Sequence, residues 1–311
     1  MNMYKPEGML ISSARNHELV ATIDGLRRAL EYGYILEAPC ILSDNEMNLH
    51  VSLGAHIHGM ISRDEVVYSY PDTEVKDIAI LTRVGKVVSF CVTGIREDEN
   101  GDYTVFLSRR RAQMECMRNY IDTLAAGDII DAKVTHLESF GAFVDIGCGV
   151  ISLLPIDQIS VSRIAHPSER ISVGEHIKVV VKNKDELGRI FVSTKELLGT
   201  WLENAARFKE GETVRATIRG IMPYGIFVEL APNLAGLAEL RAGVEENQSA
   251  AVYIKSILPD RMKIKLIIID TFDEKQPRAK QELFVDTSTV THMDRWVYSP
   301  PSSKRTVEVI F

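Results

Sequence analysis

The chain has 311 residues, 45 % of them apolar, and a formal net charge of −7. This length and composition predict two or three domains with buried cores, and the acidic balance argues against a general polyanion binder. No stretch approaches ~20 uncharged apolar residues and the first residues lack a basic-then-apolar pattern, so we expect neither a membrane span nor a secretory signal.

Four cysteines stand singly along the chain, at Cys40, Cys91, Cys116 and Cys148. They lack the Cys-x-x-Cys or Cys/His spacing of a zinc site. Isolated thiols are typical of proteins in a reducing compartment. We therefore expect buried thiols, no metal site and a cytoplasmic location.

Residues 26–110 are predicted to form the first of three repeated domains. Residues 48–54 align with 141–147 of the next repeat at an offset of 93, but residues 106–108 align with 191–193 at an offset of only 85. The shrinking offset indicates longer loops in this degenerate copy. A short amphipathic helix is predicted after it, over residues 112–124.

Residues 126–197 are the most intact repeat. Apolar and polar residues alternate over 129–136 with the period of a half-buried strand, and Gly141 interrupts a β-rich run as it would in a strongly bent strand. Further short strands are predicted over the apolar runs 150–154, 177–183 and 189–193. Five short strands in about 70 residues are typical of an oligonucleotide-binding (OB) barrel.

The third repeat, residues 209–270, follows a second predicted helix over 196–208. Residues 126–134 match 210–218, and 140–146 match 224–230, both at an offset of 84. Toward the end of the repeat the offset falls to 74, which means that the loop between the third and fourth strands is shortened.

The tail, residues 271–311, belongs to no repeat. Strands are predicted over 283–287, 296–299 and 305–310, interrupted by Pro300-Pro301. The tail either extends the third barrel or pairs with another element. The fold class predicted for the whole chain is therefore mainly β: tandem five-stranded OB barrels joined by short helices, with a C-terminal β extension.

Three motifs give the middle repeat a recognisable signature: Gly127 before the first strand, the aromatic-Gly-x-Phe-Val-acid block 140–145, and the Asp-x-x-Gly-Arg-Ile turn 185–190. With these motifs the chain resembles, over residues 26–270, the S-one RNA-binding domain family, the repeat family of bacterial small-subunit ribosomal protein S-one. The resemblance implies OB barrels, RNA binding and no catalysis.

The resemblance also implies which side chains face the nucleic acid. A histidine of the family is replaced by Pro155 in the middle repeat and by Glu239 in the third, and the first repeat has Met47 and His50 at the aromatic positions. The implied contacts of the middle and third repeats are Phe140, Phe143, Asp185, Arg189, Tyr224, Phe227 and Lys263.

Aromatic rings suit this task because each single-stranded base stacked on a ring gains about 1–3 kcal/mol with little sequence preference. The alternative is that these rings fill the barrel cores, which stays open most of all for Phe143 and Phe227. Basic residues on the strands and turns can contact phosphate, with solvated surface lysines as the alternative. We count three of them among the candidates: Lys133, Lys182 and Lys184.

The predicted function is binding of single-stranded RNA, in particular messenger RNA in translation, with the small ribosomal subunit as a further expected partner. No phosphate-binding loop, zinc-protease motif or nucleophile elbow is present, so we expect no enzyme, catalytic residue or cofactor. The alternative function is a protein–protein scaffold of the ribosome or RNA-processing machinery. The sequence leaves the oligomeric state open.

Overall fold

The computed structural model describes residues 4–68, 76–273 and 281–311. Residues 69–75 of the first predicted domain and 274–280 of the predicted tail lie outside the described residues. The chain divides into two compact units. The first unit holds the described residues up to 124 together with 131–133 and 145–151, and the second holds all others.

Two helices precede the first barrel, α1 (Ala14–Val20) and α2 (Ile23–Tyr32). Each begins at a hydroxyl cap, since Ser13 and Thr22 accept hydrogen bonds from backbone N–H groups of the first turn. Gly33 ends α2 in the left-handed conformation, with φ of 66°.

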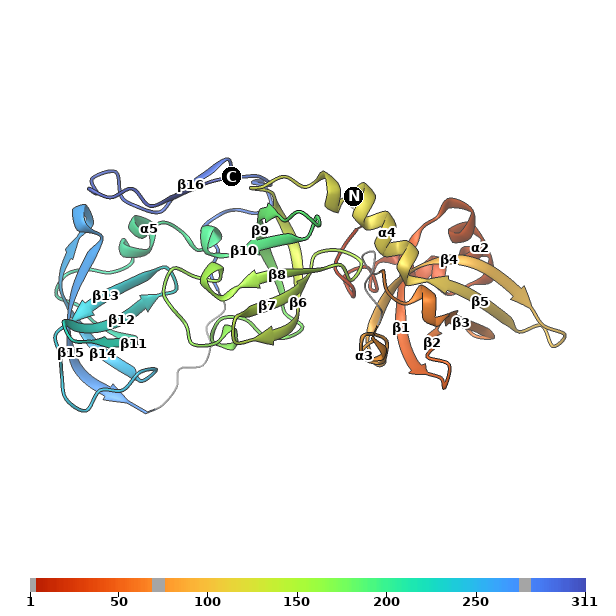
Figure 1. Ribbon diagram of the computed structural model, residues 1–311, viewed down its shortest axis with the longest axis horizontal. Coiled ribbons are helices and arrows are strands. Elements are labelled where there is room, and N and C mark those ends of the chain that lie inside the picture. The colour runs from red at the N-terminus through yellow and green to blue at the C-terminus, as the bar shows by residue number, and fades with distance from the viewer. Residues whose placement is uncertain (1–3, 69–75, 274–280) are drawn as a thin grey trace. The chain divides into compact units, whose positions relative to one another are not determined.

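The first barrel is closed, with strand order β1-β2-β3-β5-β4 (Figure 1). Phe90, Leu49 and Ile61 are fully buried in its core. The predicted longer loops are present: η1 (Arg63–Glu65) and α3 (Asp77–Leu81) both lie between β3 and β4. The strands are β1 (Ile35–Ser43), β2 (Leu49–Ser52), β3 (Ile57–Ile61), β4 (Val87–Glu97) and β5 (Tyr103–Ser108).

The first linker helix, α4 (Arg109–Asn119), begins earlier than predicted and is followed by η2 (Ile121–Thr123). Ser108 caps it through a hydrogen bond from the Arg111 backbone N–H. Three consecutive arginines, 109–111, by themselves lead one to expect a solvated face or a phosphate contact. For Arg109 this expectation is wrong, because its side chain is buried and pairs with Glu7.

The middle barrel is also closed, with strand order β10-β8-β7-β6-β9. Between β8 and β9 runs a long loop that contains η3 (Ile156–Gln158) and η4 (Pro167–Glu169). The strands are β6 (Ile129–Glu138), β7 (Gly141–Asp145), β8 (Ile151–Pro155), β9 (His176–Lys184) and β10 (Ile190–Ser193).

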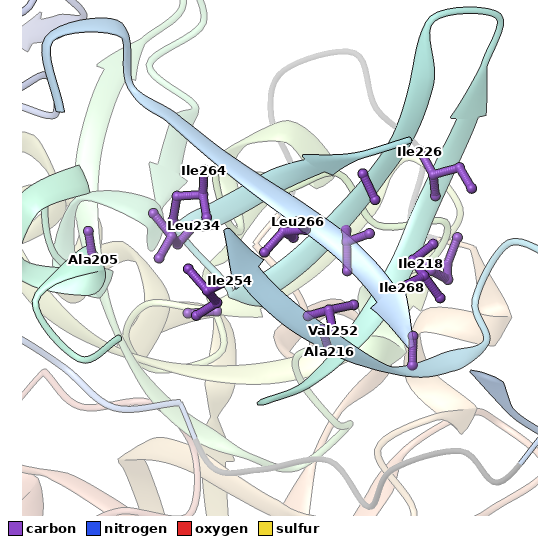
Figure 2. Packing of buried hydrophobic residues seen from close by; sticks show 14 of the residues in the cluster. Ala205, Ala216, Ile218, Ile226, Leu234, Val252, Ile254, Ile264, Leu266 and Ile268 are labelled. Carbon is purple, nitrogen blue, oxygen red and sulfur yellow. The ribbon is translucent and has the colours of Figure 1, made fainter. Parts of the chain in front are cut away.

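The second predicted helix is split into η5 (Lys195–Leu198) and α5 (Trp201–Ala205), because Gly199 interrupts it with φ of 82°. The third barrel follows, with order β11-β12-β13-β15-β14. Figure 2 shows its core, where Ile218, Ile254 and Leu266 meet from three strands. The elements are β11 (Thr213–Met222), β12 (Gly225–Ala231), β13 (Leu234–Ala238), β14 (Ser249–Leu258), η6 (Pro259–Arg261) and β15 (Lys263–Phe272).

The tail contains two paired strands, β16 (Arg295–Val297) and β17 (Glu308–Ile310). The strand predicted over 283–287 is wrong: Phe284 instead packs on Gly199 and donates its backbone N–H to Leu197 O. Both alternatives for the tail hold in part. Trp296 and Tyr298 join the third barrel's core, while His292 bridges to Asp128 at the start of the middle barrel.

The described residues thus form three closed five-stranded barrels with few helices, which confirms the predicted fold class. The predicted domain limits themselves stay predictions. All four cysteines lie in the described part of the chain and are free and buried, as expected. None of the helices among the described residues is long and apolar enough to cross a membrane.

Candidate nucleic-acid interface

A pair of aromatic rings lies on the middle barrel and another on the third. The Phe140 and Phe143 ring centroids are 6.0 Å apart at an interplanar angle of 87°. Tyr224 and Phe227 are arranged alike, 6.1 Å apart at 88°. Such edge-to-face pairs are favourable arrangements of aromatic rings. The repeat at offset 84 therefore reproduces side-chain geometry as well as backbone.

The glycine inside each aromatic block makes this arrangement possible. A Cβ at Gly141 would lie 2.5 Å from Leu154 O, and one at Gly225 would lie 2.7 Å from Ala238 O, where Gly225 also has φ of 150°. Only glycine fits so close to the neighbouring strand. Each glycine is the first residue of its strand, β7 or β12, and does not lie inside a bent strand as the sequence predicts. The first ring of each pair therefore lies in the turn before the strand, and the second ring lies two residues into the strand.

The leading ring of each pair is largely exposed. Phe140 is 53 % exposed and Tyr224 69 %, so the core interpretation is wrong for both. Phe227 is 36 % exposed and Phe143 is half-buried, which places neither in a barrel core. The exposed faces of the rings are available to a base.

Strand register extends each pair into a row across the barrel. In the third barrel Phe227 is paired with Leu237, and Leu237 with Lys265. Directly paired residues project to the same face of a sheet. The equivalent rows are His50, Met60 and Phe106 in the first barrel and Phe227, Leu237 and Lys265 in the third. In the middle barrel Leu153 is paired with Phe191, and Phe143 completes the row as the residue equivalent to Phe227 at offset 84.

Two aromatic groups of the middle barrel were missed by sequence reasoning. Phe191 is half-buried on β10, paired with Leu153 on one side and Asn183 on the other. His136 lies on β6 with its ring 6.4 Å from that of Phe143 and nearly parallel to it. Phe191 is visible in the alignment of the repeats, where it matches Lys265 at offset 74. The family signature, however, includes neither position 191 nor position 136.

Asp185 and Arg189 lie together in the turn before β10. Arg189 Nε donates to Asp185 Oδ2 at 2.7 Å, and the Arg189 backbone N–H donates to Oδ1 at 2.8 Å. Desolvation acts to raise the pKa of Asp185, but these hydrogen bonds outweigh it and lower the pKa below its ordinary value. Asp185 therefore positions the exposed Arg189 guanidinium.

The predicted lysines do not form one group. Lys133 Nζ donates to Glu7 O at 2.7 Å, which favours a structural role. Lys182 Nζ lies 3.4 Å from Glu196 Oε1 and 5.1 Å from the ring centroid of the C-terminal Phe311. Lys184 is exposed at the end of β9, and Lys263 is exposed at the start of β15. The last two remain candidates for phosphate contact.

The acid that ends each aromatic block is buried and structural. Asp145 accepts backbone N–H groups of Glu7, Gly147 and Gly149. Burial, and then the neighbouring Glu7 carboxylate, raise the pKa of Asp145 to about 7. In the third barrel the equivalent Glu229 accepts from Arg219 at 2.6 Å. Neither acid is available to RNA.

The first barrel departs from this pattern. His50 Nδ1 lies 2.7 Å from His58 Nε2, and His50 Nε2 lies 3.0 Å from Asp44 Oδ2. The row there ends in Phe106, which Arg96 covers at 5.4 Å. Among residues 4–68, 76–273 and 281–311, no three His, Cys, Asp or Glu side chains form a group that could hold a metal ion.

Comparison with known proteins identifies the middle barrel. Residues 123–195 match the model of the S1 RNA binding domain family. The small ribosomal subunit protein bS1 homolog of Bacillus subtilis is 31 % identical over 215 residues, covering 64 % of this chain and 55 % of that protein. The middle barrel thus matches the S1 RNA binding domain family, and the chain as a whole is similar to small ribosomal subunit protein bS1.

Two further proteins are similar to parts of the chain. Small ribosomal subunit protein bS1 of Staphylococcus epidermidis is 35 % identical over 168 residues, covering 50 % of this chain and 43 % of that protein. The chain thus spans about half the length of the curated bS1 relatives it matches. The solution structure of GSP13 from Bacillus subtilis is 30 % identical, covers 23 % of this chain and 55 % of that one, and has a TM-score of 0.22.

Proposed function

We propose that the protein binds single-stranded RNA, with bases stacked on the aromatic pair of the middle S1 barrel and the equivalent pair of the third. The observation that carries the proposal is the exposure of Phe140 beside Phe143, repeated in Tyr224 beside Phe227. Every base presents a π face, so this surface accepts many sequences. The S1 match over 123–195 supports RNA as the ligand.

Within this proposal the RNA is messenger RNA in translation, held at or near the small ribosomal subunit in the cytoplasm. The support is the likeness to proteins named as small ribosomal subunit protein bS1. The same likeness supports a binding role without catalysis. Phosphate contacts come from Arg189, which Asp185 positions, with Lys184 and Lys263 as further candidates.

The proposal is tested by titrating the full chain with a short pyrimidine RNA, once as a single strand and once annealed to its complement. Stacking requires unpaired bases, so the single strand should bind at least tenfold more tightly. Equal affinity for both forms would exclude stacking as the mode of binding.

A second function, protein docking, is favoured by the first barrel alone. There the row of His50, Met60 and Phe106 continues to Leu42 on β1, which is 45 % exposed, beside Ile41 at 53 %. Two exposed apolar side chains, Ile41 and Leu42, thus lie near His50, where the other barrels have aromatic pairs. If the full chain fails to bind RNA at low salt, the scaffold function replaces RNA binding.

A further inference from the structure

The C-terminal tail is fixed to the third barrel by buried aromatic residues. Trp296 and Tyr298 are 6 % and 8 % exposed and belong to that barrel's core. Tyr298 OH donates to Asn233 O at 2.7 Å, and Trp201 N–H donates to Tyr298 O at 3.0 Å. The residues that follow Tyr298 therefore start from a defined point on the barrel.

A turn after Tyr298 carries the chain to the end of the β14–β15 hairpin. The Tyr298 N–H donates to Val307 O at 2.9 Å and closes the turn, within which Ser303 N–H donates to Pro300 O. The Lys304 N–H donates to Asp260 O in η6 at 3.4 Å. The sequence 300–306, which we call the tail turn, thus lies beside η6.

Five exposed cations gather where the tail turn meets the β14–β15 hairpin. We call this surface the basic patch, and it consists of Arg261, Lys263, Lys265, Lys304 and Arg305. Asp260 lies 3.6 Å from Arg261 Nε, and within the described chain the other cations of the patch form no ion pair. Such a concentration of positive charge on a chain of net charge −7 requires a compensating partner or solvent.

The basic patch is continuous with the aromatic pair of the third barrel. Lys265 ends the row that begins at Phe227, two strands away, or about 10 Å at the usual strand spacing. Lys263 lies two residues earlier on β15 and so projects to the same face. The tail turn lies beside η6, which immediately precedes β15.

The third barrel has a shorter loop than the middle barrel, and it lacks the positioned arginine. Between β13 and β14 it has residues 239–248, where the middle barrel has 156–175 between β8 and β9. It also has Lys263 in place of the Asp185-positioned Arg189. The tail turn supplies two cations on the same barrel.

We propose that the basic patch is a phosphate-binding surface for RNA, in which Lys304 and Arg305 of the tail extend the path of a strand stacked on Tyr224 and Phe227. This rests on the proposed RNA-binding function. RNA is favoured over an acidic protein because the cations continue a row of exposed rings that suits unstacked bases. The tail, which belongs to no repeat, then serves as a binding element of the third barrel.

The test compares two doubly substituted full-length chains that have lost the same charge. Lys304→Gln with Arg305→Gln removes the tail cations, while Arg27→Gln with Arg118→Gln removes two exposed helix cations of the other unit. Binding of a single-stranded pyrimidine RNA is measured over a series of salt concentrations. Each lost phosphate contact should flatten the plot of log affinity against log salt by about 0.7, so the tail variant should lose roughly 1.4.

The control variant should keep the wild-type slope. Equal slopes for wild type and tail variant, with RNA bound normally, would overturn the tail's role and leave the proposed function standing. Equal flattening in both variants would overturn it as well, since the effect would be one of total charge. If the wild-type chain binds no RNA at low salt, the proposed function fails, and this inference fails with it.

Discussion

Arg109 and Glu7 form a buried ion pair with two contacts, Nε to Oε1 at 2.7 Å and Nη2 to Oε2 at 3.0 Å. The pair joins α4 to the N-terminal segment across 102 residues of sequence. Desolvation acts to raise the pKa of Glu7, but the Arg109 guanidinium outweighs it and lowers that pKa.

Removal of one partner should be strongly destabilising, because the other charge is then buried without compensation. We expect Arg109→Ala to lower the free energy of unfolding by about 3–5 kcal/mol. Arg118→Ala, on the exposed side of the same helix, should change it by no more than about 0.5 kcal/mol. Urea unfolding followed by circular dichroism measures both, and similar small effects for the two would show that the ion pair is unimportant.

Phe191 should contribute to RNA binding, although its position is outside the family signature. It is half-buried in the row of Phe143 and Leu153. Loss of one stacked base should cost about 1–3 kcal/mol of binding free energy. We expect Phe191→Leu, which keeps most of the apolar volume, to weaken binding in an anisotropy titration with short RNA. Unchanged affinity would confine stacking to the two rings of the block.

The middle barrel should bind more tightly than the third, because it has the positioned Arg189 and two further aromatic groups. In the full chain, Phe140→Ala should therefore weaken binding more than Tyr224→Ala. Both rings are exposed, so both variants should unfold at the wild-type denaturant concentration. A larger loss for Tyr224→Ala would reverse the ranking of the barrels.

The attachment of the tail to the middle barrel should depend on pH through His292. Its Nδ1 lies 2.7 Å from Asp128 Oδ1, and this hydrogen bond raises the pKa of His292 above its ordinary value of 6.5. A raised pKa means that the stabilisation is fully present below about pH 6.5 and is lost as pH rises through the folded-state pKa.

Hydrogen exchange can follow this attachment, because the Ile129 N–H donates to Thr291 O and the Met293 N–H donates to Gly127 O. Protection factors for these amides should be higher at pH 6 than at pH 8. In His292→Gln they should be alike at the two pH values. A wild-type chain with pH-independent protection would show that the imidazole does not hold the tail.

The fold was predictable because the repeat itself is visible in the sequence, at the constant offset of 84 between the blocks at Phe140 and Tyr224. The buried environment of Arg109 was not predictable. Its partner Glu7 is distant in sequence, and three consecutive arginines indicate a solvated face. The strand predicted over 283–287 failed for a related reason. Its apolar residues include Phe284, whose ring packs on Gly199 rather than into a sheet.

The interface was predictable in its rings and less so in its cations. The block around Gly141 identifies both rings, although Gly141 begins β7 after a turn and does not lie inside a bent strand. Lys133 and Lys182 have partners in the N-terminal segment and at the C-terminus, respectively. Alternation along a strand identifies an outward side chain but not the segment that covers it.

The most direct test of the account is the affinity of the full chain for a short pyrimidine RNA after substitution of Phe140 alone. Phe140→Ala should weaken binding by about 1–3 kcal/mol, the contribution of one stacked base. Phe140→Tyr should bind like the wild type, and neither variant should change the unfolding midpoint, because the ring is 53 % exposed. If Phe140→Ala binds RNA as tightly as the wild type, or if it instead loses cooperative unfolding, then base stacking on this ring is contradicted.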